Sequence, residues 1–249
     1  MNYKVFIINL DTNPQRLASI AERCHEIGLP FERVSGVMGN QLTPEQINEV
    51  YDTETNLRRY DKKLNEGEIG CYMSHMSCWK KIVDEQLDFA LILEDDILPR
   101  PQIVECLKRF ETVSLDWDYI KLHNKKLKYI SESKSLGSDM QLHKLAKLSS
   151  SGACQLVSYS GAEKMLAHAL PISRPIDVDV QYWFERDLRA FAVSPSMTDS
   201  TQFESDIEKV SLTHRDLVKR RPIKRILLRT VYEVKIMMSR FNLPKFPKI

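Results

Sequence analysis

The chain has 249 residues, of which 43% are apolar and 28% are charged, and its formal net charge is only +2. This composition excludes an intrinsically disordered chain, and the length is sufficient to bury a core. The near-neutral total hides an asymmetry, because residues 215–249 hold 11 Lys and Arg against 2 Asp and Glu, a net charge of +9, which leaves −7 for residues 1–214. We therefore divide the chain into an acidic body, residues 1–210, and a basic tail, residues 211–249.

No stretch of the sequence reaches the roughly 18 consecutive apolar residues that a membrane-spanning helix needs. The apolar run Val5–Ile8 lacks the length and the small-residue cleavage site of a signal peptide. The five cysteines are scattered and form no CxxC pair, which is typical neither of a zinc ribbon nor of a disulfide framework. We therefore expect a cytoplasmic protein.

Strand-like and helix-like segments alternate along the body. The apolar run 5–10 predicts a strand, and Pro14 begins a helix that we expect to end near Gly28. Apolar residues at three- and four-residue spacing predict a helix over 66–84, and the continuous apolar run 89–93 predicts a buried central strand. This alternation indicates an α/β sheet covered by helices on both faces. The remaining expected elements are strands at 31–35, 117–122 and 153–159, helices from 43, over 100–111 and over 161–170, and a long loop over the Lys- and Ser-rich residues 123–150.

Three adjacent carboxylates, Glu94, Asp95 and Asp96, follow directly after the apolar run Leu91–Leu93. At the carboxyl end of a buried strand such a cluster needs a partner, because like charges repel and burial penalises each of them. A divalent cation such as Mg²⁺ or Mn²⁺ prefers these oxygen ligands, and α/β sheets bind ligands at this end of their strands. Substrate phosphates usually complete the shell of such a metal, so we also expect a nucleotide diphosphate. The alternative is that Asp95 or Asp96 caps the segment near Pro99.

A second candidate segment begins with Gly67 and Gly70, which open a helical pattern and leave backbone amides available to an anion. Ser74 and His75 follow within the same pattern. Adjacent residues on a helix do not face each other, so these two do not form a nucleophilic pair. On residue type alone, His75 is better interpreted as a buried, hydrogen-bonded side chain.

A third candidate segment contains Asp177 and Asp179. In an extended segment the two carboxylates would lie on one face, where either is a candidate general base. The alternative is that they cap a helix containing Tyr182, Trp183 and Phe184, whose rings either stack on a sugar or belong to the core.

Four blocks of the chain, within residues 4–207, resemble glycosyltransferase family 25, the lipopolysaccharide and lipooligosaccharide glycosyltransferases. The loop Ser35–Gly39 departs from the family pattern, and the tail lies outside the resemblance. The blocks are Val5–Asp11 with Pro14 and Arg16, Gly67–Cys71 with Ser74 and His75, Leu91–Asp96, and Gly161–Lys164 with Pro171 and Asp177–Asp179.

The resemblance implies a GT-A-like, Rossmann-type fold with a mostly parallel sheet flanked by helices. It also implies an inverting enzyme that moves a hexose, usually galactose from UDP-galactose, onto a sugar of a bacterial lipid-linked oligosaccharide. Glu94 and Asp96 take the positions of an acidic motif that binds Mn²⁺ or Mg²⁺, with Asp96 in direct contact with the ion. Asp177 or Asp179 becomes the base or an acceptor contact. The donor-site candidates are Asn9, Asp11, Arg16, Glu68, Ser74, His75 and Asp95.

Two alternatives to a galactosyltransferase remain open at the level of the sequence. A glucosyl- or N-acetylhexosaminyltransferase of the same build would carry the same motifs, because a few contacts outside them read the orientation of one hydroxyl group. A non-catalytic carbohydrate- or nucleotide-binding module would keep the fold, but such a module has no need of the clustered carboxylates at residues 94–96.

The tail has the pattern of a basic amphipathic helix from Pro222 onward. Such a helix either lies on an anionic membrane surface, through residues 215–249, or docks its apolar stripe on the body. We expect the membrane contact, on the inner face of the cytoplasmic membrane, and no nucleic acid partner, because the body is acidic and carries no recognition motif. The stripe consists of Ile223, Ile226, Leu227, Thr230, Val231, Val234, Met237, Met238 and Phe241, interspersed with the cations Lys224, Arg225, Arg229, Lys235 and Arg240.

Overall fold

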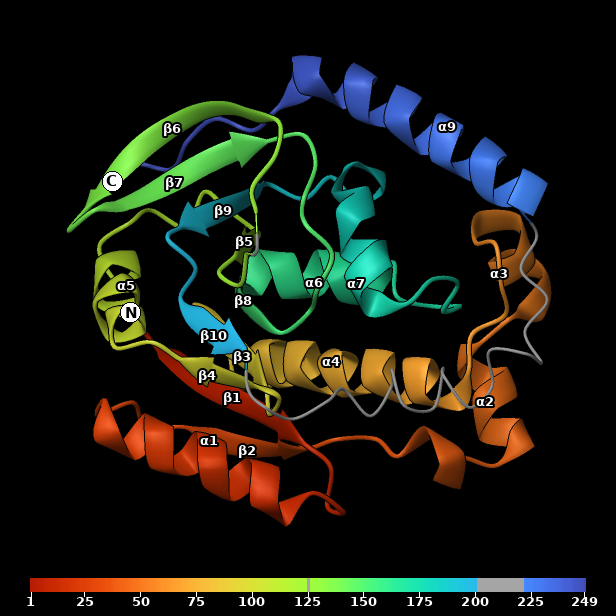
Figure 1. Ribbon diagram of the computed structural model, residues 1–249, viewed down its shortest axis with the longest axis horizontal. Coiled ribbons are helices and arrows are strands. Elements are labelled where there is room, and N and C mark those ends of the chain that lie inside the picture. Colours follow the sequence, from red (N-terminus) through yellow and green to blue (C-terminus); the bar gives the residue numbers. More distant parts are fainter. Residues whose placement is uncertain (125, 201–221) are drawn as a thin grey trace.

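A single eight-stranded sheet forms the centre of the molecule, in the spatial order β2-β1-β3-β8-β5-β9-β7-β6 (Figure 1). The structure is a computed structural model and describes residues 1–124, 126–200 and 222–249. The strands of this sheet are β1 (Tyr3–Asn9), β2 (Glu32–Ser35), β3 (Phe89–Glu94), β5 (Tyr119–Lys121), β6 (Ile130–Gly137), β7 (Met140–Leu145), β8 (Cys154–Ser158) and β9 (Ala190–Ser194).

Most strands of the sheet run in one direction. Strand β1 pairs in parallel with both β2 and β3, and β5 pairs in parallel with β9. The reversed strands are β8, which is antiparallel to both β3 and β5, and β7, which is antiparallel to both β9 and β6. The α/β fold with a large, mostly parallel sheet is thereby confirmed, and β1, β3 and β5 end at the same edge of that sheet.

Successive residues of the central strands feed two separate cores, one on each face of the sheet. Val5 and Ile7 of β1 belong to the first core, whereas Phe6 between them belongs to the second. Helices α1 (Pro14–Glu26) and α5 (Gln102–Phe110) close the first core. Helices α4 (Glu66–Asp84) and α6 (Tyr159–Ala167) close the second. The predicted cover of helices on both faces is confirmed.

Helix α4 is the long element that carries the second candidate segment, and it begins where the sequence predicts. The Asn65 side chain accepts a hydrogen bond from the Glu68 backbone at 2.8 Å, and the Glu68 carboxylate accepts one from the Asn65 backbone at 2.9 Å. This reciprocal cap fixes the first turn. A side chain at Gly70 would approach the Val37 carbonyl to 2.5 Å, so the small residue lets the helix pack directly on the preceding loop.

The prediction of a long loop over residues 123–150 is wrong, because β6 and β7 form an antiparallel hairpin there. Strand β6 lies at the sheet edge and exposes nearly all of its side chains. Lys and Ser suit such an exposed edge, so no apolar alternation marks it in the sequence. Strand β9 and the short pair β4 (Ile97–Pro99) and β10 (Thr198–Ser200) were likewise not predicted.

The remaining helices lie along the second core and beside it. The predicted tail helix is confirmed as α9 (Pro222–Ser239), while the expected boundary between body and tail, near residue 210, falls outside the described residues. None of the described helices has the length and apolar character required to cross a membrane. The other helical segments are η1 (Gly39–Gln41), α2 (Pro44–Val50), α3 (Thr53–Arg59), α7 (Ile176–Asp179), η2 (Val180–Glu185) and η3 (Arg240–Asn242).

Candidate functional site

The candidate site lies at the edge of the sheet where β1, β3 and β5 end. Asn9 and Glu94 are the last residues of β1 and β3, and Lys121 is the last residue of β5. Because β1 and β3 pair in parallel, with Ile8 opposite Glu94, Asn9 is level with Asp95, the residue that follows β3. Ligands of α/β sheets bind at this edge.

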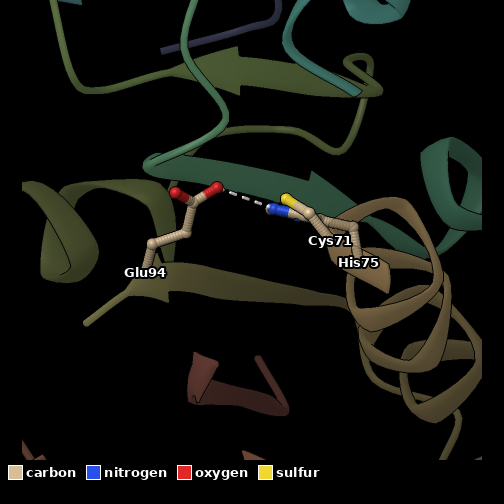
Figure 2. Close-up of side chains that lie close together, drawn as sticks. All are labelled: Cys71, His75 and Glu94. Carbon is tan, nitrogen blue, oxygen red and sulfur yellow. Dashed lines mark hydrogen bonds and ion pairs between the residues drawn. The ribbon is translucent and has the colours of Figure 1, made fainter. Parts of the chain in front are cut away.

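Glu94 is held by a histidine from the helix on the second face. Figure 2 shows the His75 ring, from α4, directed at the Glu94 carboxylate, with Nε2 2.9 Å from Oε1. On the other side of the ring, Nδ1 lies 3.0 Å from the Gln155 amide nitrogen. A side chain at Gly152 would come within 3.0 Å of the same Glu94 oxygen, so the chain there passes close to the pair. Burial raises the pKa of Glu94, but the hydrogen bond and charge of His75, together with Lys121 and His123, outweigh that effect and leave the pKa below its usual range.

Cys71 lies one helical turn before His75 and completes a group of metal-capable atoms (Figure 2). The Cys71 sulfur, a His75 ring nitrogen and a Glu94 oxygen all lie within 4.8 Å of one another. Burial, and then the nearby negative charge of Glu94, raises the pKa of the Cys71 thiol well above its usual range. The thiol is therefore protonated at neutral pH, whereas Glu94 is available to a cation as a charged oxygen ligand.

Asp95 is tied to the start of the chain. Asn9 donates to its carboxylate at 2.6 Å and Arg16 at 3.3 Å, and the Asp95 side chain is only 10% exposed. Three of the predicted donor-site residues therefore form one contact group. Asp11 lies farther out, with its side chain 68% exposed, and accepts hydrogen bonds from Arg33 and Ser35.

Asp96 is the most strongly perturbed carboxylate of the cluster. Burial raises its pKa to about 7, and the neighbouring charges of Glu94 and Asp95 act in the same direction. A cation placed among these groups would favour the charged form of Asp96. The role of Glu94 and Asp96 as metal ligands stays a prediction.

The structure separates Asp177 from Asp179. Both belong to the helical turn α7, so they do not share a face as they would in an extended segment. Burial and then the charge of Glu94 raise the pKa of Asp177, against the opposing effect of Lys121. Asp177 therefore lies within electrostatic reach of the carboxylate cluster.

Asp179 instead lies in a buried network behind the site. Its carboxylate accepts hydrogen bonds from Tyr72 at 2.6 Å, from Arg174 at 3.3 Å and from Arg186. The Arg174 guanidinium also packs 3.6 Å from the centre of the Tyr182 ring. The aromatic residues Tyr182 and Trp183 are thus engaged with the protein, and Trp183 is buried in the second core.

The two remaining donor-site candidates make local contacts that hold α4 in place. Glu68 caps the helix and accepts a hydrogen bond from Lys62 at 2.7 Å. Ser74 accepts a hydrogen bond from the Val37 amide at 2.8 Å and donates to the Gly70 carbonyl at 2.7 Å. The role of both residues in donor binding stays a prediction.

Lys121 is a site residue that the sequence analysis did not single out. It is fully buried, and its ammonium group donates to the Ser151 carbonyl. Burial lowers the pKa of Lys121 to about 8, against the raising effects of Asp177 and Glu94. The signal that could have found it is a lysine within the apolar run Tyr119–Leu122. Gln155, in the middle of a buried strand and bonded to His75, is a similar case.

Comparison with known proteins places these residues in a family. Residues 2–180 match the family model described as "Glycosyltransferase family 25 (LPS biosynthesis protein)". Procollagen galactosyltransferase 1-B of Xenopus laevis is 27% identical over 242 residues, covering 86% of this chain and 38% of that protein. A glycosyltransferase 25 family member of Drosophila melanogaster is 31% identical over 218 residues, covering 77% of this chain and 34% of that protein.

The chain thus spans little more than a third of the length of these relatives. Among solved structures, A197 from STIV is 13% identical and superposes with a TM-score of 0.40, over 82% of this chain and 87% of that one. The family match covers β1, the opening turns of α4, the end of β3 and α7, which are the elements that build the candidate site. The chain belongs to glycosyltransferase family 25.

Proposed function

We propose that this protein transfers a hexose, galactose from UDP-galactose, to a sugar hydroxyl of a lipooligosaccharide or lipopolysaccharide acceptor, with inversion at the anomeric carbon. The observation that carries the proposal is the accumulation of carboxylates at the edge of the sheet. The charges of Glu94 and Asp95 act on Asp96, the charge of Glu94 acts on Asp177, and burial raises the pKa of Asp96 to about 7. Such a cluster suits a cation with a phosphate-bearing ligand.

A divalent metal fits the donor set. Glu94 and Asp96 would hold Mn²⁺ or Mg²⁺, because both provide the hard oxygen atoms that these ions prefer. When bound, the ion supplies positive charge that offsets the charge developing on the departing UDP. The raised pKa of Asp96 supports this assignment, because in the absence of a cation the protein holds a proton there instead.

The chain's own residues position this chemistry. His75 fixes the Glu94 carboxylate, and Asn9 and Arg16 fix Asp95, so neighbouring carboxylates are held by bonds from three different elements. Side chains held in this way need little rearrangement when substrate binds, which favours catalysis.

Asp177 is the better candidate for the general base. A general base must lie within hydrogen-bond distance of the attacking hydroxyl and have a pKa near the working pH. Burial raises the pKa of Asp177 toward that range. Asp179 is less suited, because its carboxylate is committed to Tyr72, Arg174 and Arg186. In the proposed reaction Asp177 accepts the proton of the acceptor hydroxyl as that oxygen attacks the sugar from the face opposite UDP.

The names of the relatives support galactose as the transferred sugar, and the acceptor has to be determined by experiment. The Xenopus relative is named a procollagen galactosyltransferase, whereas the family model is described by lipopolysaccharide biosynthesis.

We include a cytoplasmic location in the proposal, because all five cysteines are free thiols and a reducing compartment keeps them so.

The test is UDP release from a panel of nucleotide sugars, with and without Mn²⁺. We expect turnover with UDP-galactose that requires the metal and increases when a sugar acceptor is added. Parallel reactions with a lipooligosaccharide fragment and a procollagen peptide distinguish the two acceptor classes. If only UDP-glucose or only a UDP-N-acetylhexosamine is turned over, that nucleotide sugar is the donor instead of UDP-galactose. Binding of UDP-sugars without turnover would contradict the proposed enzymatic activity.

A further inference from the structure

Helix α9 docks on the body through a narrow stripe. Tyr232 and Ile236, one turn apart, are 7% and 2% exposed. The Tyr232 ring lies 4.7 Å from the ring of Tyr182 in η2, measured between centroids. Lys235 beside this stripe forms an ion pair with Glu185 at 2.9 Å. These contacts fix the rotation of the helix about its own axis.

The wide apolar stripe of α9 points away from the body. The docking alternative for this stripe is wrong, because its large apolar members are exposed to between 44% and 88%. By the 3.6-residue period, this stripe lies on the side of the helix opposite Tyr232 and Ile236. The exposed members are Ile223, Ile226, Leu227, Val231, Val234, Met237, Met238 and Phe241.

The chain that follows α9 returns to the body and anchors the helix at that end. The ring of Phe246 stacks on Phe191 of β9, with the centroids 5.8 Å apart. The Lys248 carbonyl accepts a hydrogen bond from the Ser114 amide at 2.9 Å. The outward direction of the apolar stripe is therefore set by contacts on both the helix and the segment after it.

Cations border this stripe on both sides. In helical projection, Lys224 and Lys235 lie along one border and Arg229 and Arg240 along the other. Glu233 also lies on the second border, and its charge is paired with Lys147 of the body. An apolar stripe between two rows of cations fits a bilayer surface, where acyl chains meet anionic headgroups.

A second copy of the chain fits this stripe less well. An 18-residue helix is about 27 Å long and about 10 Å wide, so the stripe offers about 300 Å². A stable interface buries about 800 Å² on each partner. Two such stripes packed face to face would also bring like-charged borders together, which is unfavourable.

We propose that the outward face of α9 binds the surface of an anionic lipid bilayer, with the helix lying in the plane of the interface and the body held above it. The apolar side chains enter the acyl boundary, and Lys224, Arg229 and Arg240 contact lipid phosphates, while Lys235 stays paired with Glu185. This inference concerns where the protein is held and does not depend on the identity of the sugar transferred.

The experiment is co-sedimentation of the full chain with vesicles of equal parts phosphatidylcholine and phosphatidylglycerol. We expect the Ile226→Ser/Leu227→Ser variant to bind at least about tenfold more weakly than the wild type, because two apolar side chains no longer enter the bilayer. The matched variant Ile226→Leu/Leu227→Ile should bind as the wild type does. Neutral phosphatidylcholine vesicles should bind more weakly, and Lys224→Gln/Arg229→Gln should reduce binding only to the anionic vesicles.

Metal-dependent release of UDP should be unchanged in the serine variant, which shows that the body is folded. Equal pelleting of the wild type and the serine variant would overturn the proposal. A concentration-dependent dimer by light scattering, which the serine variant dissociates while vesicle binding is absent, would assign the stripe to a second copy instead.

Discussion

Two aspartates, the buried Asp118 and the partly buried Asp96, differ in which charges surround them. Burial alone would raise the pKa of Asp118, but hydrogen bonds from Arg189, Lys164 and Ser160 lower it to about 2. For Asp96, burial and the charges of Glu94 and Asp95 together raise the pKa to about 7. Cations and hydrogen bonds thus outweigh burial at Asp118, whereas burial and neighbouring carboxylates outweigh the effect of Arg16 at Asp96.

This difference separates structural carboxylates from candidate functional ones. Asp118 connects α6 to the start of β9, through Lys164 and Arg189. Asp179 connects α4 to the residue after η2 in a similar way, through Tyr72 and Arg186. Neither network needs an external ion. For the cluster at the end of β3 we propose that a bound cation supplies further positive charge, because perturbed carboxylates of this kind are typical of functional sites.

The largest effect is expected from Asp96→Ala. Removing this carboxylate should lower transfer by about 1000-fold, because metal assistance contributes several kcal/mol to the barrier. The melting temperature of the metal-free protein should be unchanged or higher, since a repulsive charge has been removed. Single-turnover kinetics and calorimetry measure the two quantities, and a variant with full activity contradicts the metal assignment.

Asp118→Asn should reverse this pattern. The substitution removes the charged partner of Arg189 and Lys164. Because these two side chains are 35% and 32% exposed, we expect a loss of about 2 kcal/mol, less than for a fully buried pair. Turnover per folded molecule should be retained, because Asp118 lies outside the candidate site. Urea unfolding measures the free energy, and a stable but inactive variant would break the distinction between the two regions.

Asp177→Asn and Asp179→Asn compare a candidate functional carboxylate with a structural one within the same helical turn. Asp177→Asn should lower turnover by about 100-fold with little change in unfolding, as expected for loss of a general base. Asp179→Asn should mainly lower stability, because Arg174 and Arg186 lose a charged partner. If neither variant reduces turnover to this extent, both assignments of the base fail.

The free energy of unfolding should also change with pH, gradually and in opposite directions for the two aspartates. The folded pKa of Asp118 is depressed to about 2, so its contribution is present above its unfolded pKa and is lost as the pH falls, by about 2 kcal/mol between pH 4 and pH 2. Asp96 has the opposite sign, because its folded pKa is raised to about 7. Its contribution is present below about pH 4 and is lost as the pH rises through about 7.

Differential calorimetry of the metal-free wild type against Asp96→Ala resolves the second effect. The wild type should lose stability relative to the variant between about pH 4 and about pH 7, and Mn²⁺ should restore it. A difference between the two proteins that does not change over this range would show that Asp96 titrates normally.

Much of the fold could be predicted from the sequence because its central elements are strongly patterned. The helix expected over 66–84 and the strand at 89–93 agree with α4 and β3 almost to the residue. The hairpin β6–β7 was missed because most of β6 is exposed at an edge, where burial imposes no apolar pattern. Its stability comes from pairing with β9 through β7, which no local pattern reports.

The candidate site could be predicted in part, for a related physical reason. Three consecutive carboxylates are visible in a single sequence, and so is their place at the end of a buried strand. The separation of Asp177 from Asp179 depends on the direction of one helical turn and on partners more than a hundred residues away, such as Tyr72. The buried Lys121 is set in the site by a sheet register that only the fold defines.

The most direct test of the central claim is Mn²⁺ binding, followed by electron paramagnetic resonance in the presence of UDP. We predict that the wild type binds the ion, that Asp96→Ala weakens the affinity at least about tenfold, and that Asp118→Asn leaves it unchanged. Equal Mn²⁺ affinity of the wild type and Asp96→Ala would contradict the claim that the carboxylates at the end of β3 form a cation site.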